Sequence, residues 1–293
     1  MKLTATSPIS IAVLSSSYLV HLILGGNSAF AQTPDTPDDR EPLIFIPRQV
    51  SESDDAPGDT RNPYPQPSPG EVNHCENIKE HLQALVPVRV TTVEENSSFS
   101  EVRENIIELT LDETPTFWFY IPEQNSLTAE FSLLDENSFE LYTSGDLSLP
   151  SDRGFVGVTL PNHLGEEELL QVGQDYRWQF DIICNPDRPS LNLKVQGWVR
   201  RIEGGEINID LQEVEDVNVD YTMRRPDILN LAREGMWYDT LTLVGASYYE
   251  NPSDPEIALD WQTLLEYIGL EEYAEVTVRA LYLPESGENE ENQ

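Results

Sequence analysis

Basic residues are scarce in this chain of 293 residues. It has 17 lysines and arginines against 53 aspartates and glutamates, which gives a formal net charge of −36. Such a charge disfavours binding to nucleic acids and to anionic membranes, because both are polyanions. It suits basic partners and divalent cations, but a solvated acidic surface is the simpler interpretation.

Catalytic signatures are missing as well. The chain has four histidines and contains no G-x-S-x-G or H-E-x-x-H motif. His74, Cys75 and His81 lie close together, but a structural zinc site needs about four ligands and no second pair accompanies them. His163 falls in an expected turn. We therefore expect no enzyme and no cofactor, and a hydrolase with a dispersed site is the third alternative.

Only one long hydrophobic run occurs, and it lies at the N-terminus. It spans residues 9–24, follows the single charge of Lys2 and precedes Ala-Phe-Ala at 29–31, which fits the A-x-A cleavage rule. The sequence predicts that residues 1–31 are a signal peptide cleaved after Ala31. The mature protein is then periplasmic, on the cell surface or secreted. No later run approaches the roughly 20 residues of a spanning helix, so we expect no transmembrane segment in the mature chain.

Cysteine is rare, with only Cys75 and Cys184 in the chain. An even number of cysteines in an exported protein favours one disulfide over two buried thiols. This bond would close a loop of about 110 residues, for which the chain-entropy model gives at most roughly 4–5 kcal/mol. The sequence therefore predicts a disulfide between Cys75 and Cys184.

Proline-rich and acidic segments flank the expected domains. Residues 32–73 contain nine prolines among polar residues and are expected to form a disordered linker. Within it, residues 43–46 form a short apolar stretch. We expect it to dock onto its own domain as a short edge strand, and pairing with the sheet edge of a partner is the alternative. Residues 284–293 are acidic and are expected to be a disordered tail.

The aromatic stretch at residues 114–122, TPTFWFYIP, predicts a central strand that is buried on both faces. Later segments alternate apolar and polar residues with a period of two, as strands with one buried face do. These segments are residues 131–134, 139–142, 155–160, 176–182 and 191–199. Trp118 and Trp178 fall at core positions of this pattern. We predict an antiparallel β-sandwich over residues 74–222, either jelly-roll or immunoglobulin-like.

The period becomes helical from Pro226 onward. Asp254 followed by Pro255 is a typical helix start, and Gly269 is a typical helix end. Residues 223–283 are therefore expected to form a C-terminal α-helical hairpin. The predicted fold class is mainly β, with this hairpin added to the sandwich.

Two aromatic residues and one acidic stretch are candidates for recognition. Trp198 lies opposite the inward-facing residues of its strand, and Tyr142 ends a hairpin, so both are candidate surface-recognition residues. Burial beneath the helices is the other interpretation. The densest acids raise the alternative of calcium binding, although they do not converge in one loop. They are Asp210, Glu213, Glu215, Asp216 and Asp220.

Several motifs occur in an order that resembles a known family. They are PTFWFYIP at 115–122, AEF at 129–131, Y-x-W-x-F-x-x-x-C-x-P-x-R at 176–188, G-W-V-x-R at 197–201 and G-x-W-Y-D-x-L at 235–241. Together they resemble the cyanobacterial domain-of-unknown-function family 928 over about residues 75–275, with a departure at 203–225. The resemblance implies an exported cyanobacterial protein with no assigned activity, and its gene neighbourhoods point to the cell envelope.

These observations lead to three functional hypotheses. The first is a non-enzymatic periplasmic or cell-surface module that binds a protein partner in the cell envelope. The second is a glycan-binding β-sandwich that uses exposed aromatic and acidic residues, with calcium as an optional cofactor. The third is the hydrolase with a dispersed site. An apolar surface patch would favour the first hypothesis, an exposed aromatic row the second, and a deep pocket with histidine and acid the third.

Overall fold

The aromatic stretch forms strand β5 (Thr116–Ile121), and every residue of this strand is buried, as predicted. It pairs antiparallel with β1 (Gln83–Ala84) on one edge and with β9 (Gly154–Thr159) on the other. Strand β14 (Val278–Tyr282) adds to β9 in parallel and completes a four-stranded sheet. The long aromatic and β-branched side chains of β5 suit a strand that is covered on both faces.

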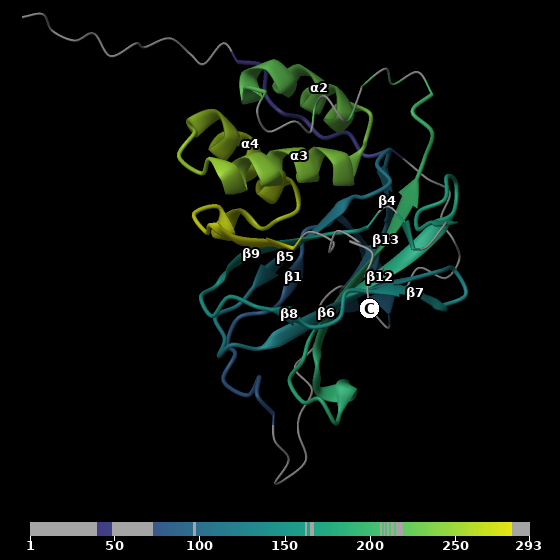
Figure 1. The fold of residues 1–293 in the computed structure, drawn as a ribbon, viewed down its shortest axis with the longest axis vertical. Helices are drawn as coiled ribbons and strands as arrows, with labels where there is room; N and C mark the ends of the chain where they lie inside the picture. Colours follow the sequence, from purple (N-terminus) through teal and green to yellow (C-terminus); the bar gives the residue numbers. More distant parts are fainter. Residues whose placement is uncertain are drawn as a thin grey trace, which may run out of the picture. The chain divides into compact units, whose positions relative to one another are not determined.

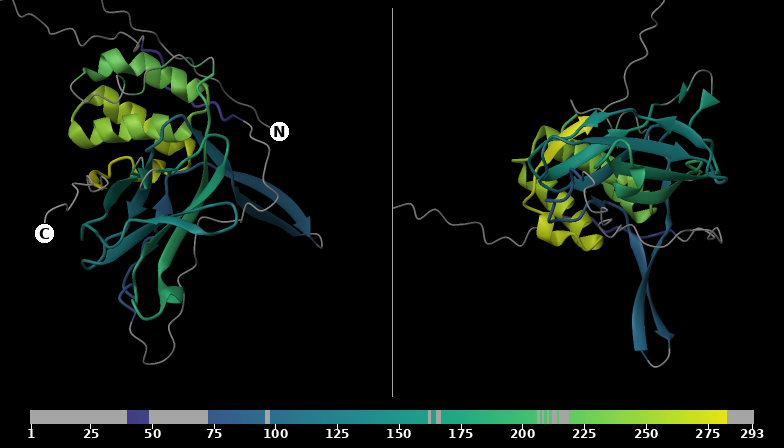
Figure 2. Two further views of the ribbon diagram at one scale, coloured as in Figure 1. Left: turned by 45° about the vertical axis from the view of Figure 1, so that its right-hand side comes forward. Right: turned by 90° about the horizontal axis from the view of Figure 1, so that it is seen from below.

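A second sheet contains six strands. They are β4 (Ile107–Thr110), β13 (Leu193–Arg201), β12 (Asp175–Ile182), β6 (Thr128–Leu134), β7 (Glu140–Thr143) and β8 (Leu147–Ser148). Burial along β12 alternates at every residue, in agreement with the period of two in the sequence. The remaining strands form two separate hairpins, β2 (Val88–Glu95) with β3 (Ser98–Asn105), and β10 (His163–Leu164) with β11 (Glu167–Glu168). Figure 2 shows the hairpin of β2 and β3 projecting from the two sheets.

Aromatic side chains join the two sheets. The ring of Phe119 on β5 stacks on that of Phe180 on β12 at 4.1 Å between centroids. Phe117, also on β5, packs against Phe131 of β6 at 4.9 Å and against Trp178 at 5.7 Å. The predicted core position of Trp178 is therefore confirmed.

The helices cover the other face of the four-stranded sheet (Figure 1). They are α2 (Tyr221–Arg233), α3 (Trp237–Glu250) and α4 (Pro255–Tyr267). Trp118 on β5 contacts Trp261 on α4 at 5.8 Å between ring centroids, which confirms its core position. Gly245 on α3 makes room for this packing, because a Cβ atom there would lie 2.7 Å from the Trp118 ring.

Two predictions about the fold need correction. The sheets are mixed rather than purely antiparallel, since β4 runs parallel to β13 and β14 runs parallel to β9. Alternation in a sequence indicates which face of the sheet a residue occupies, but it does not indicate the direction of the strand. The helices before β14 supply the long connection that a parallel pair of strands needs. The mainly β class is confirmed, but neither the jelly-roll nor the immunoglobulin-like arrangement is established by this connectivity.

Three helices occur where a helical hairpin is predicted. Helix α2 already begins at Tyr221, and Pro226 lies inside it rather than at its start. The Asp220 carboxylate caps this helix by accepting a hydrogen bond from the Thr222 N–H at 2.9 Å. The predicted cap at Asp254 and the predicted helix end at Gly269, with φ of 73°, are both confirmed.

This computed structural model describes residues 40–48, 73–95, 98–161, 163–164, 167–205, 207, 209, 211, 214 and 219–282. From Pro42 onward the chain forms one compact unit, which contains both the sheets and the helices. The expected signal peptide and acidic tail lie outside the described residues, as does the expected linker except for residues 40–48 and Asn73. Each of two expected regions therefore contains a part that packs elsewhere in the unit. Residues 42–48 of the expected linker pack on the helices, and β14, within the expected helical region, joins the four-stranded sheet.

Among the described residues, no helix is both long enough and apolar enough to cross a bilayer.

Candidate functional site

Residues 42–48 form an extended segment that packs on the helices (Figure 1, purple). Leu43 and Phe45 are buried, with 4% and 7% of their surface exposed, whereas Ile44 and Ile46 are 54% and 51% exposed. This alternation is that of an extended chain with one covered face. The prediction that this stretch docks onto its own domain is confirmed, although it packs on helices and not on a sheet edge. We call residues 42–48 the docked segment.

Two aromatic side chains form the walls around Phe45. Its ring meets the Trp237 ring edge-on at 4.9 Å and the Tyr267 ring at 5.1 Å between centroids. Trp237 opens α3, Tyr267 ends α4, and their own rings lie 5.8 Å apart. The Trp237 indole N–H donates to the Leu85 carbonyl at 3.0 Å, so the connection after β1 fixes this wall. Edge-on aromatic pairs of this kind add about 0.5–1.5 kcal/mol beyond the area they bury.

The end of α2 forms the floor beneath the docked segment. The Ile46 N–H donates to the Ala232 carbonyl, in the last turn of α2, at 3.0 Å. Gly235, just after this helix, has φ of 76°, a conformation that favours glycine. A Cβ atom on Gly235 would lie 2.7 Å from the Arg48 nitrogen and 2.9 Å from the Ile46 oxygen. Gly235 is thus required by the turn and by the close approach of the segment. We call the surface formed by Ala232, Gly235, Trp237 and Tyr267 the peptide groove.

Two buried acids lie where β4 meets α3, with Glu108 on β4 and Asp239 on α3. Burial raises the pKa of Glu108, on β4, to about 8, and burial followed by the charge of Glu108 raises the pKa of Tyr267. Burial, with a smaller effect from Asp112, raises the pKa of Asp239 to about 7. The Asp239 carboxylate accepts the Leu111 N–H at 3.0 and 3.1 Å and so ties β4 to the first turn of α3. These carboxyls titrate near neutral pH inside the fold.

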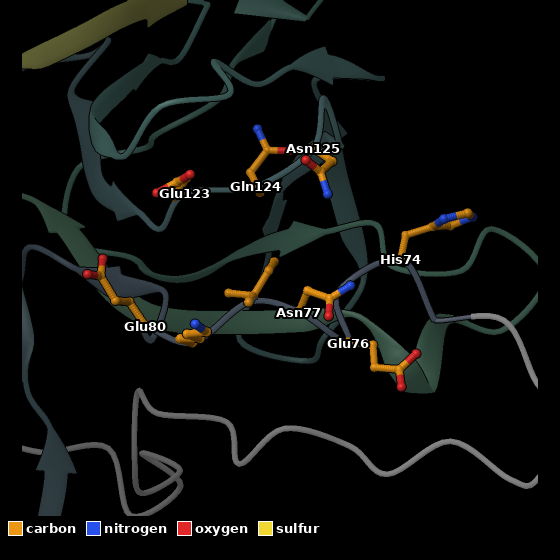
Figure 3. A pocket seen from close by; sticks show the side chains of 9 residues that line it. His74, Glu76, Asn77, Glu80, Glu123, Gln124 and Asn125 are labelled. Carbon is orange, nitrogen blue, oxygen red and sulfur yellow. The ribbon is translucent and has the colours of Figure 1, made fainter.

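A polar cleft of about 530 Å³ is a second candidate site (Figure 3). One side comes from the chain before β1 and the other from the connection between β5 and β6. In Figure 3 the side chains of Asn77 and Glu80 lie on one side of the cleft and those of Glu123 and Asn125 on the other. The lining residues are His74, Glu76, Asn77, Ile78, Lys79, Glu80, Glu123, Gln124 and Asn125.

A disulfide and several hydrogen bonds hold the two sides of this cleft. The predicted bond between Cys75 and Cys184 is present, and the His74 N–H donates to the Cys184 carbonyl at 3.0 Å. The buried Gln124 donates to the Pro150 carbonyl at 2.5 Å and accepts the Leu127 N–H at 2.6 Å. Its amide therefore shapes the loop and is already used within the fold.

Carboxylates dominate the charge of the cleft. Glu80 accepts a hydrogen bond from the Tyr120 hydroxyl and forms an ion pair with Arg153 at 3.2 Å. Burial, and then the hydrogen bond to Glu80, raise the pKa of Tyr120. Glu76 and Glu123 add negative charge, and Lys79 adds one positive charge. This lining suits hydrogen bonding to polar ligands.

The structure describes all three residues of the histidine and cysteine cluster that was considered for zinc. Cys75 is oxidised in the disulfide, while His74 and His81 are both exposed. Across the described residues, no group of three or more histidine, cysteine or acidic side chains is arranged to hold a metal ion. The side chain of His163 lies outside the described residues. Of the calcium candidates, only Asp220 is described, and it caps α2; Asp210, Glu213, Glu215 and Asp216 lie outside the described residues.

Of the two interpretations of Trp198, burial is correct, because only 5% of its surface is exposed. It stands in register with Arg177 on one side and with the buried Ile107 on the other, so neighbouring side chains shield it on the outer face of the six-stranded sheet. Tyr142 is half-buried and packs against the core, in register with Leu133. Neither residue offers a free aromatic platform.

The peptide groove was partly visible in the sequence, whereas the polar cleft was not. The short apolar stretch from Leu43 to Ile46 marks the docked segment, but nothing in the sequence indicates that it meets Trp237 and Tyr267. The cleft joins two segments that are distant in sequence and carry no motif, so no local pattern connects Asn77 with Asn125.

Comparison with known proteins gives a family and no individual relative. A family model described as Domain of Unknown Function (DUF928) matches residues 56–278. The match includes the peptide groove and the polar cleft, whereas the docked segment precedes it. Neither the comparison with curated proteins nor the comparison with solved structures gives a match.

Proposed function

Because the chain belongs to the DUF928 family, whose description names no activity, we propose from its structure that it is a non-catalytic protein-interaction module of the cell envelope. One observation carries this proposal. The helical layer binds an extended apolar peptide, which in this chain is its own docked segment. Grooves that accept extended or helical peptides are a common means of protein recognition.

Exposed apolar side chains support the same surface. Large exposed apolar residues on a soluble domain often mark a contact with another protein. Ile44 and Ile46 flank Phe45, and Phe45 contacts Tyr267, which is itself 42% exposed. The exposed side chains of Ile44, Ile46 and Tyr267 form an apolar rim around the filled peptide groove. Met223, Tyr249 and Leu259 are further exposed apolar residues on the helices.

The location in the envelope is supported by two features of the sequence and one of the fold. The sequence predicts a signal peptide over residues 1–31 and a negatively charged mature chain. The disulfide between Cys75 and Cys184 suits an oxidising compartment such as the periplasm or the cell surface. The cyanobacterial origin implied by the resemblance stays a prediction.

Site-directed photo-crosslinking in cells of the source organism tests this function. A photoreactive phenylalanine analogue replaces Tyr267, which ends α4 and is 42% exposed at the rim, or Phe139, which is 70% exposed on the β6–β7 turn, as the control. We expect a discrete adduct with an envelope protein from position 267 and none from position 139. An uncleaved cytoplasmic protein, or the absence of any adduct from position 267, would contradict the proposal.

The polar cleft supports glycan binding as a second candidate function. Its volume of about 530 Å³ suits a small ligand, and its amide, imidazole and carboxylate groups suit sugar hydroxyls. Calorimetric titration of envelope oligosaccharides, with and without calcium, tests both the glycan and the calcium hypothesis. We expect Asn77→Ala with Asn125→Ala to abolish any heat of binding. Heat that survives this double substitution would place the ligand elsewhere.

A further inference from the structure

We propose that the peptide groove is a binding site for an extended segment of a protein partner with the pattern Leu-x-Phe, and that the docked segment occupies it as an intramolecular competitor. The inference rests on the proposed function, because it specifies what the partner presents to the module. In this proposal Leu43 and Phe45 are the anchors of the segment, and the peptide groove is their receptor.

The contacts of the docked segment are those of a bound peptide. Leu43 and Phe45 supply alternate side-chain anchors, and Ile46 supplies a backbone hydrogen bond to Ala232. The other face of the segment stays open, since Ile44 and Ile46 are more than half exposed. Peptides that bind in extended form use this combination of main-chain bonds and alternate side-chain pockets.

The walls of the groove are held by the fold and not by the segment. Trp237 is anchored to the Leu85 carbonyl, and its ring also contacts that of Tyr267. The positive φ of Gly235 follows from the helix end, because Gly269 after α4 adopts nearly the same φ. A receptor whose walls are fixed in advance loses little freedom when it exchanges one peptide for another.

The chain length between segment and domain also permits exchange. Between Arg48 and Asn73 lie 24 residues, which span at most about 80 Å when fully extended. The docked segment is therefore tethered to the domain at a distance and is not forced into the groove by its neighbours in the chain. A tethered ligand competes with an external one through its effective concentration. The family match covers the groove at residues 232–267 and begins after the segment.

Peptide binding to the full-length exported chain tests the proposal. The probe is a fluorescein-labelled peptide with the sequence of residues 40–48, Arg-Glu-Pro-Leu-Ile-Phe-Ile-Pro-Arg, and the readout is fluorescence anisotropy. One variant carries Leu43→Ser with Phe45→Ser, which removes both anchors. The matched control carries Ile44→Ser with Ile46→Ser, which removes similar apolar surface from the outward face.

The two double variants should differ strongly. Removal of the internal competitor should tighten probe binding about tenfold or more relative to the native chain, because the groove becomes free in most molecules. The Ile44 and Ile46 variant should bind the probe as the native chain does. Equal binding by both variants, or no binding by a folded Leu43 and Phe45 variant, would overturn the proposal.

A second pair of substitutions places the probe in the groove. Added to the Leu43 and Phe45 variant, Gly235→Ala should abolish probe binding, because its Cβ would occupy the space next to the peptide backbone. Gly269→Ala introduces the same backbone strain at positive φ, but no atom lies within 4 Å of its Cβ. It should therefore retain probe binding. Equal loss from both substitutions would contradict the assigned location.

The native chain provides a test that does not depend on any variant folding. Excess unlabelled peptide should accelerate hydrogen exchange of the Ile46 amide, since its bond to Ala232 is released on displacement. Unchanged exchange at saturating peptide would overturn the proposal. If peptide displaces the segment but position 267 gives no crosslink in cells, the groove stands and the envelope function fails. If position 267 crosslinks but no peptide binds, the interaction function stands and the groove fails.

Discussion

The centre between the two sheets and the peptide groove both bury aromatic rings, but they hold them differently. Phe119 is fully buried and stacks on Phe180, with a second sheet on one side and helices beyond the other face of its strand. Phe45 is almost as buried, yet the residues on either side of it are more than half exposed. The exposure of one side chain therefore does not show whether its segment can leave the domain. The exposure of the neighbouring residues is the more informative quantity.

Backbone hydrogen bonds strengthen this contrast. Strand β5 pairs along both edges, with β1 and with β9. The docked segment contributes one described backbone bond to the rest of the unit, from Ile46 to Ala232. Regions with few backbone bonds and open faces unfold locally at lower free energy than core strands. We therefore regard the core as permanent and the groove's occupant as exchangeable.

The largest effect is expected from a substitution at the centre. Phe119→Ala should lower the free energy of unfolding by about 3–5 kcal/mol, because it leaves a cavity between the sheets. Phe139→Ala, at a side chain that is 70% exposed, should change it by less than about 0.5 kcal/mol. Urea denaturation measures both. Similar losses from the two substitutions would show that the sheets do not enclose Phe119 in solution.

The next effect concerns the covalent anchor beside the polar cleft. Cys75→Ala with Cys184→Ala should cost about 2–5 kcal/mol, because the bond closes a loop of 109 residues in the unfolded chain. Thermal unfolding with and without a reducing agent measures the same loss in the native chain. A double variant as stable as the oxidised native protein would contradict the presence of the bond in the folded chain.

A buried acid gives an intermediate effect that depends on pH. Glu108 has an ordinary pKa of 4.5 and a folded pKa of about 8, so between these values the folded chain keeps a proton that the unfolded chain has lost. Because the folded state then binds more protons, the free energy of unfolding falls as pH rises through this window.

Glu108→Gln should flatten this fall, and at pH 8 it should raise the free energy of unfolding by on the order of 2 kcal/mol. Part of the slope should remain, because burial also raises the pKa of Asp239 to about 7. Asp152→Asn is the control, since the Asp152 side chain is 79% exposed. Urea midpoints at pH 5 and pH 8 provide the measurement. A slope unchanged by Glu108→Gln would mean that this carboxyl is not buried.

The smallest effect separates the groove from an ordinary helix end. Gly235→Ala and Gly269→Ala both place a side chain at positive φ, which costs about 1–2 kcal/mol. Gly235→Ala should cost about 1 kcal/mol more, because its Cβ also displaces the docked segment. Equal losses in thermal unfolding would indicate that the segment does not rest on Gly235.

The sequence was informative about faces and ends, and less so about directions and distant contacts. The aromatic run of β5, the alternation of β12 and the caps at Asp254 and Gly269 are local patterns, and the structure follows them. Parallel pairing of β4 and β14 depends on connections that periodicity does not encode.

The site shows the same division. The apolar stretch from Leu43 to Ile46 predicted docking, but its receptor comes from Gly235, Trp237 and Tyr267, far along the chain. Trp198 was assigned the correct face of β13, yet its burial depends on Ile107 and Arg177 from neighbouring strands. Residue contacts of this kind arise from tertiary packing and leave no local signal.

Native-state hydrogen exchange of the unmodified chain compares the two regions in one experiment. The amide of Ile46 should exchange through a local opening, with a lower free energy than the amides of β5, and this free energy should not change with low concentrations of urea. The amides of β5 should exchange only through global unfolding. If Ile46 and β5 exchanged together, with the same free energy and the same dependence on urea, the docked segment would be an integral part of the core and the peptide groove would not exist.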